Sequence, residues 1–128
     1  MRAFVFPGQG SQSVGMGKDL AEAFPVAREV FEEIDEALSQ KLSKIIFEGP
    51  DTELNLTENT QPALMAVSLA VVRVLQKAKP DLLTPAKCKF VAGHSLGEYS
   101  ALTAAGAFQL QYAARLLKTR GQAMQKAV

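Results

Sequence analysis

The residues with the clearest chemical potential form the segment Gly-His-Ser-Leu-Gly, from Gly93 to Gly97. A Gly-x-Ser-x-Gly pattern between a strand and a helix is typical of a nucleophile elbow, a sharp turn that exposes the serine hydroxyl. Here the pattern follows an apolar run at Phe90–Ala92 and precedes a helical stretch that starts near Glu98. A chance match is the alternative, but that context argues against it. The sequence therefore predicts Ser95 as a nucleophile.

Negative charge that develops on an acyl oxygen beside this serine requires hydrogen-bond donors. In a nucleophile elbow one donor is the backbone N–H of the next residue, here Leu96. A second glycine-rich segment, Gly8–Gly17, follows the first predicted strand, and loops after parallel strands share one edge of a sheet. Gln9, which lies between two glycines, is therefore a candidate for the second backbone donor. The alternative is a flexible surface loop; the glycine spacing does not fit a phosphate-binding loop.

A serine nucleophile also needs a general base, and this sequence has no suitable candidate. His94 is the only histidine, and its place next to Ser95 on a tight turn makes it a structural neighbour of the site. In elbow enzymes the acid and the histidine follow the nucleophile, but the only carboxylate after this serine is Glu98. Either the chain is not catalytic, or its base lies beyond Val128. The final predicted helix lacks a stop signal, which favours the second interpretation.

The final helix, predicted from Gln109 onward, carries a charge close to its apolar side. At about 100° per residue, Arg120 lies roughly 60° from the centre of the apolar stripe, whereas Arg115 lies near the opposite face. The stripe consists of Leu110, Ala113, Leu117, Gly121 and Met124. A guanidinium at the border of a buried face suits a carboxylate partner. An arginine that extends past the edge of the core is the alternative, and geometry alone leaves both open.

The elements that would position these residues predict an α/β fold. Short strands at Ala3–Phe6 and Phe90–Ala92 alternate with helices, which implies a parallel sheet. Helices are expected at Lys18–Phe24, Pro25–Leu38, Lys41–Phe47, Ala63–Lys77 and Glu98–Ala105. The apolar residues of the Ala63–Lys77 helix run nearly all round, so burial on more than one side is expected. A polar stretch at Thr57–Gln61 precedes this helix, and a linker at Lys79–Lys87 follows it.

Composition narrows the classes of protein. The 128 residues are 48% hydrophobic and 21% charged with a net charge of +1, which fits one globular domain and gives no electrostatic signal for nucleic acid or membrane. The single cysteine, Cys88, cannot form an internal disulfide and fits a reducing compartment. The longest apolar stretch is half of the roughly 20 residues that span a bilayer, and no secretory signal is present. We therefore expect a cytoplasmic location.

Four segments in order resemble the malonyl-CoA:acyl-carrier-protein transacylase family. They are FPGQGSQ at 6–12, TQPA at 60–63, GHSLGEYSAL at 93–102 and TRGQAM at 119–124. The resemblance implies the parallel-sheet, α/β-hydrolase-like core of that family's large subdomain. It also implies that residues 1–128 are the N-terminal part of an incomplete domain, which ends before the ferredoxin-like small subdomain. The family's catalytic chain is more than twice as long.

The resemblance also implies a reaction. Ser95 would take malonyl from malonyl-CoA as an ester and pass it to the phosphopantetheine thiol of acyl carrier protein, in ping-pong fashion. This is a step of fatty acid biosynthesis. Both thiols belong to substrates, and no permanently bound cofactor or metal is expected. Because the family's general-base histidine falls beyond Val128, the chain alone is expected to be inactive or very weak.

Individual site residues follow from the same resemblance. Gln9 and Leu96 match the two backbone donors of the oxyanion hole, and Arg120 matches the arginine that pairs with the malonyl carboxylate. Further substrate-binding positions are Gln61, His94 and Met124, of which the histidine is not the base.

Two other classes of function remain as alternatives. An α/β-hydrolase, an esterase or thioesterase, would use the same elbow on water instead of a thiol; Arg120 and the Gln9 loop argue against it. A non-catalytic half-domain is the second, because no base is present. A truncated sheet would expose an edge and part of an apolar face. We therefore expect the chain to pack against the missing C-terminal part or to self-associate.

Overall fold

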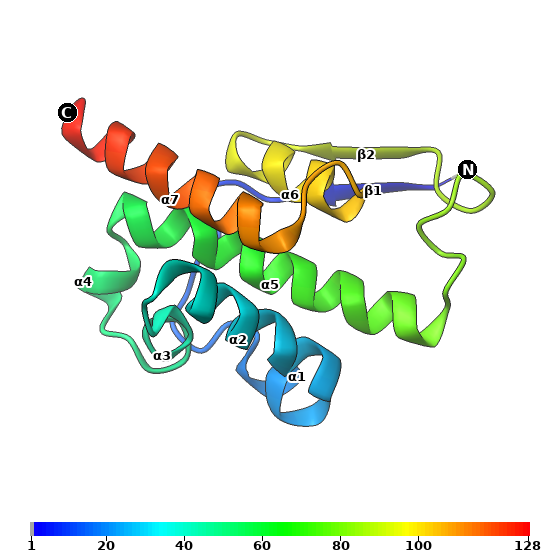
Figure 1. Ribbon diagram of the computed structural model, residues 1–128, viewed down its shortest axis with the longest axis horizontal. Helices are drawn as coiled ribbons and strands as arrows, with labels where there is room; N and C mark the ends of the chain where they lie inside the picture. Colours follow the sequence, from blue (N-terminus) through cyan, green and yellow to red (C-terminus); the bar gives the residue numbers. More distant parts are fainter. Residues whose placement is uncertain (1) are drawn as a thin grey trace.

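The structure is a computed structural model that describes residues 2–128. Its elements are β1 (Ala3–Phe6), α1 (Lys18–Ala23), α2 (Pro25–Leu38), α3 (Leu42–Glu48), α4 (Asp51–Leu54), α5 (Thr57–Ala78), β2 (Phe90–Gly93), α6 (Leu96–Ala104) and α7 (Leu110–Lys126). The long helix α5 runs through the middle of the molecule, with α2 on one side and α7 on the other (Figure 1). The two strands lie beside α6 at one edge (Figure 1).

Helix α5 is the centre of the hydrophobic core. It packs against α2, α7 and α6, which confirms the prediction that it is buried on more than one side. The largest fully buried apolar side chains come from six different helices, and they are Ile34, Leu42, Ile46, Leu54, Met65, Leu69, Leu96 and Leu117. Helix α6, which directly follows Ser95, and helix α7, which carries Arg120, are therefore anchored on one shared core.

Most predicted elements are confirmed. The bounds of β1 and α2 agree with the prediction, and those of α1, α3, β2, α6 and α7 differ by one or two residues at their ends. Helix α2 begins at Pro25, a position where the missing N–H has no intrahelical role. It ends at Leu38, and the next residue, Ser39, has a left-handed φ of 50°, a conformation common after the last turn of a helix.

The polar stretch before the long helix was predicted wrongly as non-helical. Helix α5 begins at Thr57 instead of Ala63, and the short helix α4 was not predicted. The side chain of Asn59 is buried because its Nδ2 donates to the carbonyl oxygen of Glu53 at 2.8 Å. Thr60 is fully buried as well, and its hydroxyl donates to backbone carbonyls. Polar residues enter the helix here because the neighbouring turn satisfies them.

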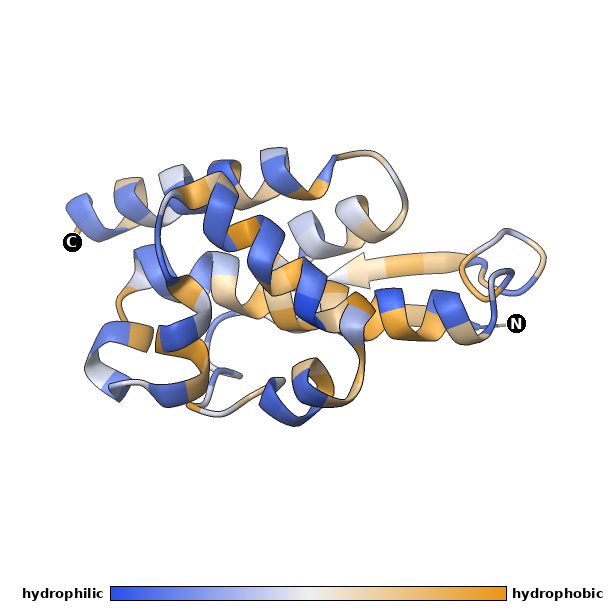
Figure 2. Cartoon of the chain, turned by 60° about the horizontal axis from the view of Figure 1, so that its bottom comes forward, coloured by the Kyte–Doolittle hydropathy of each residue, from blue (hydrophilic) through white to orange (hydrophobic). Residues whose placement is uncertain are grey.

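Strands β1 and β2 form a two-stranded parallel sheet. Ala3 pairs with Phe90 and the register continues to the pair of Phe6 and Gly93. One face of the sheet turns its side chains, Phe6 among them, toward the core. The other face is open, with Val5 77% and Phe90 61% exposed. In Figure 2 a strand of the sheet is drawn in orange that fades toward its tip, which marks its mainly apolar character.

This open face leads to the first testable prediction. Because contiguous exposed apolar side chains on a strand favour association, we expect the 128-residue chain to form particles of more than one copy. Light scattering coupled to size exclusion measures this. Val5→Lys should shift the distribution toward the monomer, whereas Ser13→Lys, in an exposed loop, should leave it unchanged. A monodisperse monomer of the unaltered chain would contradict the prediction.

Within residues 2–128, no helix is both long enough and apolar enough to cross a membrane.

Candidate active site

The nucleophile elbow predicted from the sequence is present in the structure. Ser95 lies between the end of β2 and the first residue of α6, with φ 56° and ψ −117°. A positive φ is costly for a non-glycine residue, and such strain is typical of the sharp turn that exposes a nucleophile. The Ser95 side chain is exposed and Leu96 begins the helix, so the N–H of Leu96 has no partner within the helix.

Two glycines allow the elbow to close. A Cβ atom on Gly93 would lie 1.9 Å from the carbonyl carbon of Gly97, and one on Gly97 would lie 2.3 Å from the carbonyl oxygen of Phe6. Both distances are far below van der Waals contact. The turn therefore folds back on itself and packs directly against the end of β1, which fixes the position of Ser95 relative to the sheet.

The glycine-rich loop after β1 lies against the elbow, as the shared sheet edge predicts. The backbone N–H of His94 donates to the carbonyl oxygen of Phe6 at 3.2 Å, and a Cβ on Gly8 would lie 2.5 Å from the carbonyl oxygen of His94. The same Cβ would lie 3.0 Å from Nδ1 of His94, so the imidazole lies beside the loop. Gln9 therefore follows a residue in direct contact with the elbow.

Arg120 reaches Ser95 from α7. Its Nη2 donates to the serine Oγ at 3.3 Å, and its Cζ lies 5.4 Å from the centre of the Tyr99 ring. Its Nη1 donates to Oε1 of Gln61. The guanidinium is half-buried, and the three contacts hold it beside the nucleophile. The structure directs this charge toward Ser95, and its predicted pairing with a carboxylate stays a prediction.

A hydrogen-bonded chain continues from the arginine to the glycine loop. Gln61 is fully buried, and its Nε2 donates to Oε1 of Gln9 at 3.1 Å. Nε2 of Gln9 in turn donates to the hydroxyl of Thr57 at 3.4 Å. Side chains from β1's loop, α5, α6 and α7 therefore converge around Ser95. This arrangement can place a carboxylate next to a hydroxyl nucleophile.

Close packing of α7 on the start of α5 sets the rotation of the arginine. A Cβ on Gly121 would lie 2.6 Å from Cα of Glu58, so the two helices touch through backbone. Beside this contact, Nζ of Lys118 lies 3.3 Å from the Glu58 carboxylate and donates to Asn59 and Gln40 at 3.0 and 2.9 Å. The residue pattern predicted this glycine only as part of an apolar stripe, and it gave no signal for the lysine, whose partners are distant in sequence.

The other end of that stripe differs from the rest. Its first four members are buried, but Met124 is 39% exposed. It lies one turn beyond Arg120, where α7 runs past the first turn of α5 (Figure 1). The structure places Met124 near the site but assigns it no polar contact, and its predicted role in substrate binding stays a prediction.

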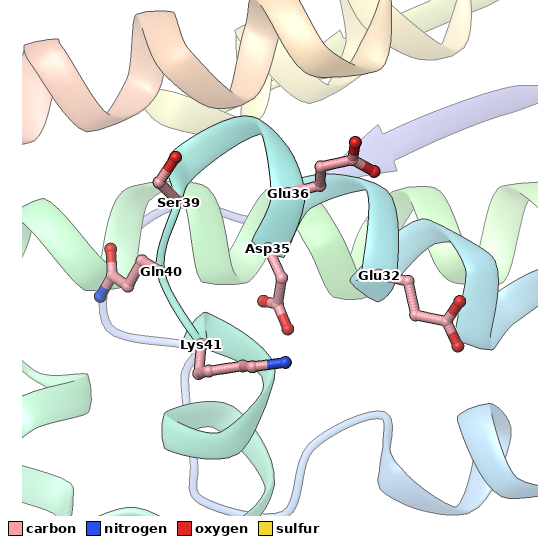
Figure 3. A pocket seen from close by; sticks show the side chains of 6 residues that line it. All are labelled: Glu32, Asp35, Glu36, Ser39, Gln40 and Lys41. Carbon is pink, nitrogen blue, oxygen red and sulfur yellow. The ribbon is translucent and has the colours of Figure 1, made fainter.

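A separate surface hollow lies at the end of α2, away from Ser95. It is lined by Glu32, Asp35, Glu36, Ser39, Gln40 and Lys41 (Figure 3). The Asp35 carboxylate there accepts hydrogen bonds from the N–H and the hydroxyl of Ser43, which tie α2 to the start of α3. Within the described residues, no group of three or more histidine, cysteine or acidic side chains is arranged to hold a metal ion.

The chain is similar to known proteins over its whole length. The family model of the acyl transferase domain matches residues 3–128. Malonyl CoA-acyl carrier protein transacylases of Bacillus subtilis strain 168 and Escherichia coli K12 are 54% and 49% identical over 98% of this chain. This chain spans only 38% and 39% of their lengths.

Solved structures agree with the sequence comparison. The acyl-carrier-protein-S-malonyltransferase of Bartonella henselae is 64% identical and superposes with a TM-score of 0.95, over all of this chain and 40% of that one. A malonyl-transacylase solved in complex with its type II PKS acyl-carrier protein is 48% identical, with a TM-score of 0.90. This match covers 98% of the present chain and 39% of the transacylase chain. The likeness bears out the predicted fold, an α/β fragment of a larger subdomain.

Proposed function

This chain belongs to the acyl transferase domain family, and from that premise we propose that it carries the nucleophile and the acyl-binding residues of a malonyl transfer site. The observation that carries this proposal is the contact of 3.3 Å between the Arg120 guanidinium and the Ser95 hydroxyl. A fixed cation at that distance suits an acyl group whose carbonyl carbon sits at the serine and whose far end is a carboxylate. Malonyl has that length and charge.

The first half of the reaction forms an ester on Ser95. Its Oγ attacks the thioester carbonyl carbon of malonyl-CoA, the C–S bond breaks, and coenzyme A leaves as its thiol with the proton that the hydroxyl gives up to a base. In the second half, the phosphopantetheine thiol of acyl carrier protein attacks the ester carbonyl and restores the serine hydroxyl. The transfer needs no resident cofactor, since both thiols enter as substrates.

The oxyanion of each tetrahedral intermediate would bind two backbone N–H groups, those of Leu96 and Gln9. Support for the first is its place at the unpaired N-terminus of α6, where the helix dipole also favours negative charge. Support for the second is the packing of the preceding residue, Gly8, against the elbow. The glycine loop and the elbow thus approach the same point from two strands.

The base is proposed to come from outside these 128 residues. His94 is exposed and directly precedes the nucleophile, and its ring lies beside Gly8. We assign it a structural role next to the site. The relatives extend well beyond the 38–40% of their length that this chain covers. Their remaining part is the proposed source of the proton acceptor.

The test uses a chimera in which residues 1–128 are joined to the downstream part of the Bartonella henselae relative, chosen for its 64% identity. We expect the chimera to transfer malonyl from coenzyme A to the thiol of holo acyl carrier protein. Ser95→Ala should abolish the transfer, and Ser13→Ala, in an exposed loop, should not change it. Release of free malonate without transfer would instead indicate a hydrolase, and transfer by the Ser95→Ala variant would contradict the assigned nucleophile.

A further inference from the structure

We propose that the side chains of Gln61 and Gln9 couple carboxylate binding at Arg120 to the placement of the oxyanion donor on the glycine loop. The inference rests on the proposed function and deepens it. It states that a malonyl carboxylate improves the geometry for bond formation as well as adding affinity. Gln61 and the Gln9 side chain are positioning residues in this account, because they act through the arginine and through the backbone of the loop.

The charge of Arg120 fixes the direction of the hydrogen bonds that run from its guanidinium through Gln61 and Gln9 to Thr57. A guanidinium can only donate, so the Gln61 amide must turn its Oε1 toward Arg120. Its Nε2 then faces Gln9 and must find an acceptor there, which is the Oε1 of that side chain at 3.1 Å. The remaining Nε2 of Gln9 points to the hydroxyl of Thr57. One cation thus orients two amides in series.

Gln61 is held rigidly enough to transmit such an orientation. Gln61 is fully buried, as are its neighbours in the sequence of α5, Thr60 and Pro62. Both ends of its amide are used, and a buried amide that lost either partner would cost free energy. Rotation of the amide therefore has to follow the arginine.

Between Gly8 and Gln12, in contrast, the hydrogen bonds that hold the glycine loop all involve side chains. Gly10 has a φ of 111°, and a Cβ there would meet nothing within 4 Å, so the loop is open on that side. The N–H of Gly10 donates to Oε1 of Gln12 at 2.8 Å, and Nε2 of Gln12 donates to Asn55 at 2.9 Å. Gln9 makes the other attachments, to α5. Loss of the Gln9 attachment would release the residue whose backbone N–H is the proposed oxyanion donor.

A carboxylate on the acyl group would bind Arg120, at one end of this series of hydrogen bonds. Arg120 has five N–H donors and uses one on each terminal nitrogen here, so others are free for a carboxylate. A bound carboxylate restrains the guanidinium, and hydrogen bonds in series strengthen one another. An acetyl group offers no such partner. Gln9 should therefore be best ordered when the acyl group carries a carboxylate.

Kinetics of the chimera separate this coupling from simple loop stability. Gln9→Met keeps the backbone N–H and the side-chain length but removes the acceptor for Gln61. We expect kcat for malonyl transfer to fall about fivefold, the loss of one hydrogen bond, with KM for malonyl-CoA within twofold. Acetyl transfer should fall by a smaller factor, about twofold, because the Gln9 attachment is lost there too but no carboxylate strengthens it. Gln12→Met is the matched control. It loosens the same loop without removing the hydrogen bonds that join Arg120, Gln61 and Gln9, and it should slow malonyl and acetyl transfer equally.

A second readout needs no turnover and uses the 128-residue chain itself. Malonate at a concentration that saturates binding by calorimetry should slow hydrogen exchange of the backbone amides of residues 8–12, and acetate should not. Gln9→Met should remove that difference. Any one of three results would overturn the coupling. They are equal slowing of malonyl and acetyl transfer by Gln9→Met, the absence of malonate binding, and backbone exchange that malonate does not change. Exchange in the 128-residue chain that malonate slows, together with a chimera that transfers no malonyl, would instead refute the proposed function and leave the coupling standing.

Discussion

Replacement of Arg120 by alanine is expected to lower kcat/KM for malonyl transfer in the chimera by about two to three orders of magnitude. The arginine is half-buried and fixed by Ser95, Gln61 and the Tyr99 ring, so it is organised before the substrate arrives. Removing one partner of such a charge pair leaves the carboxylate without a counter-ion in a partly desolvated site, which costs about 2–4 kcal/mol. The measurement is steady-state transfer from malonyl-CoA and from acetyl-CoA.

Acetyl transfer should stay within a fewfold of the unaltered rate, so the variant loses selectivity instead of all activity. Arg120→Lys keeps the charge but not the planar fork that binds a carboxylate in two places, and we expect about a tenfold loss. Arg115→Ala, in an exposed position on the same helix, is the matched control and should have no effect. Equal losses for malonyl and acetyl would show that the arginine supports the fold and does not select the acyl group.

The second large effect is expected from Gly93→Ala. The added Cβ would lie 1.9 Å from a backbone carbon of Gly97, and backbone cannot move aside as a flexible side chain can. We expect the free energy of unfolding to fall by about 3 kcal/mol, with loss of Ser95 acylation because the turn that presents its hydroxyl no longer closes. Urea denaturation of the chimera measures the first effect, and intact mass after mixing with malonyl-CoA measures the second.

A control separates this clash from the general cost of replacing glycine. Gly106→Ala introduces a side chain at a φ of 90° but meets nothing within 4 Å, so its cost should be about 1 kcal/mol and acylation should persist. If Gly93→Ala were no more destabilising than this control, the closed elbow in the structure would be wrong in its central contact.

The elbow was predictable from the sequence because its causes are local. A strand, two glycines around a serine and the first turn of a helix lie within a dozen residues, and each constrains its neighbours. The same holds for the end of β1, which Pro7 follows, and for the start of α2 at Pro25, because proline restricts the backbone at both places. Parallel pairing also followed, since strands that alternate with helices have few other arrangements.

The partners of Arg120 were not predictable from residue patterns. Helix geometry placed it at the border of a buried face, but its contacts are 25 residues away at Ser95 and 59 residues away at Gln61. Only the resemblance to a known family suggested the first of these. The second depends on the packing of α7 against α5 at Gly121, which no local signal in either helix specifies.

The helical start of α5 was also not predictable from local residue patterns. Asn59 and Gln61 resemble loop residues by type, and a proline follows them at position 62. They are helical and buried because Glu53, Gln9 and Arg120 supply hydrogen-bond partners. Tertiary contacts that satisfy buried polar groups can override local preference, and functional sites are where such contacts gather.

The most direct test of the account is the intact mass of the chimera before and after mixing with malonyl-CoA, followed by peptide mapping. The account predicts one added malonyl group, located on Ser95, absent from the Ser95→Ala variant and discharged by holo acyl carrier protein. It also predicts far less adduct with acetyl-CoA. A folded chimera that gains no mass, or an adduct on any residue other than Ser95, would contradict the central claim that this serine is the acyl carrier of the site.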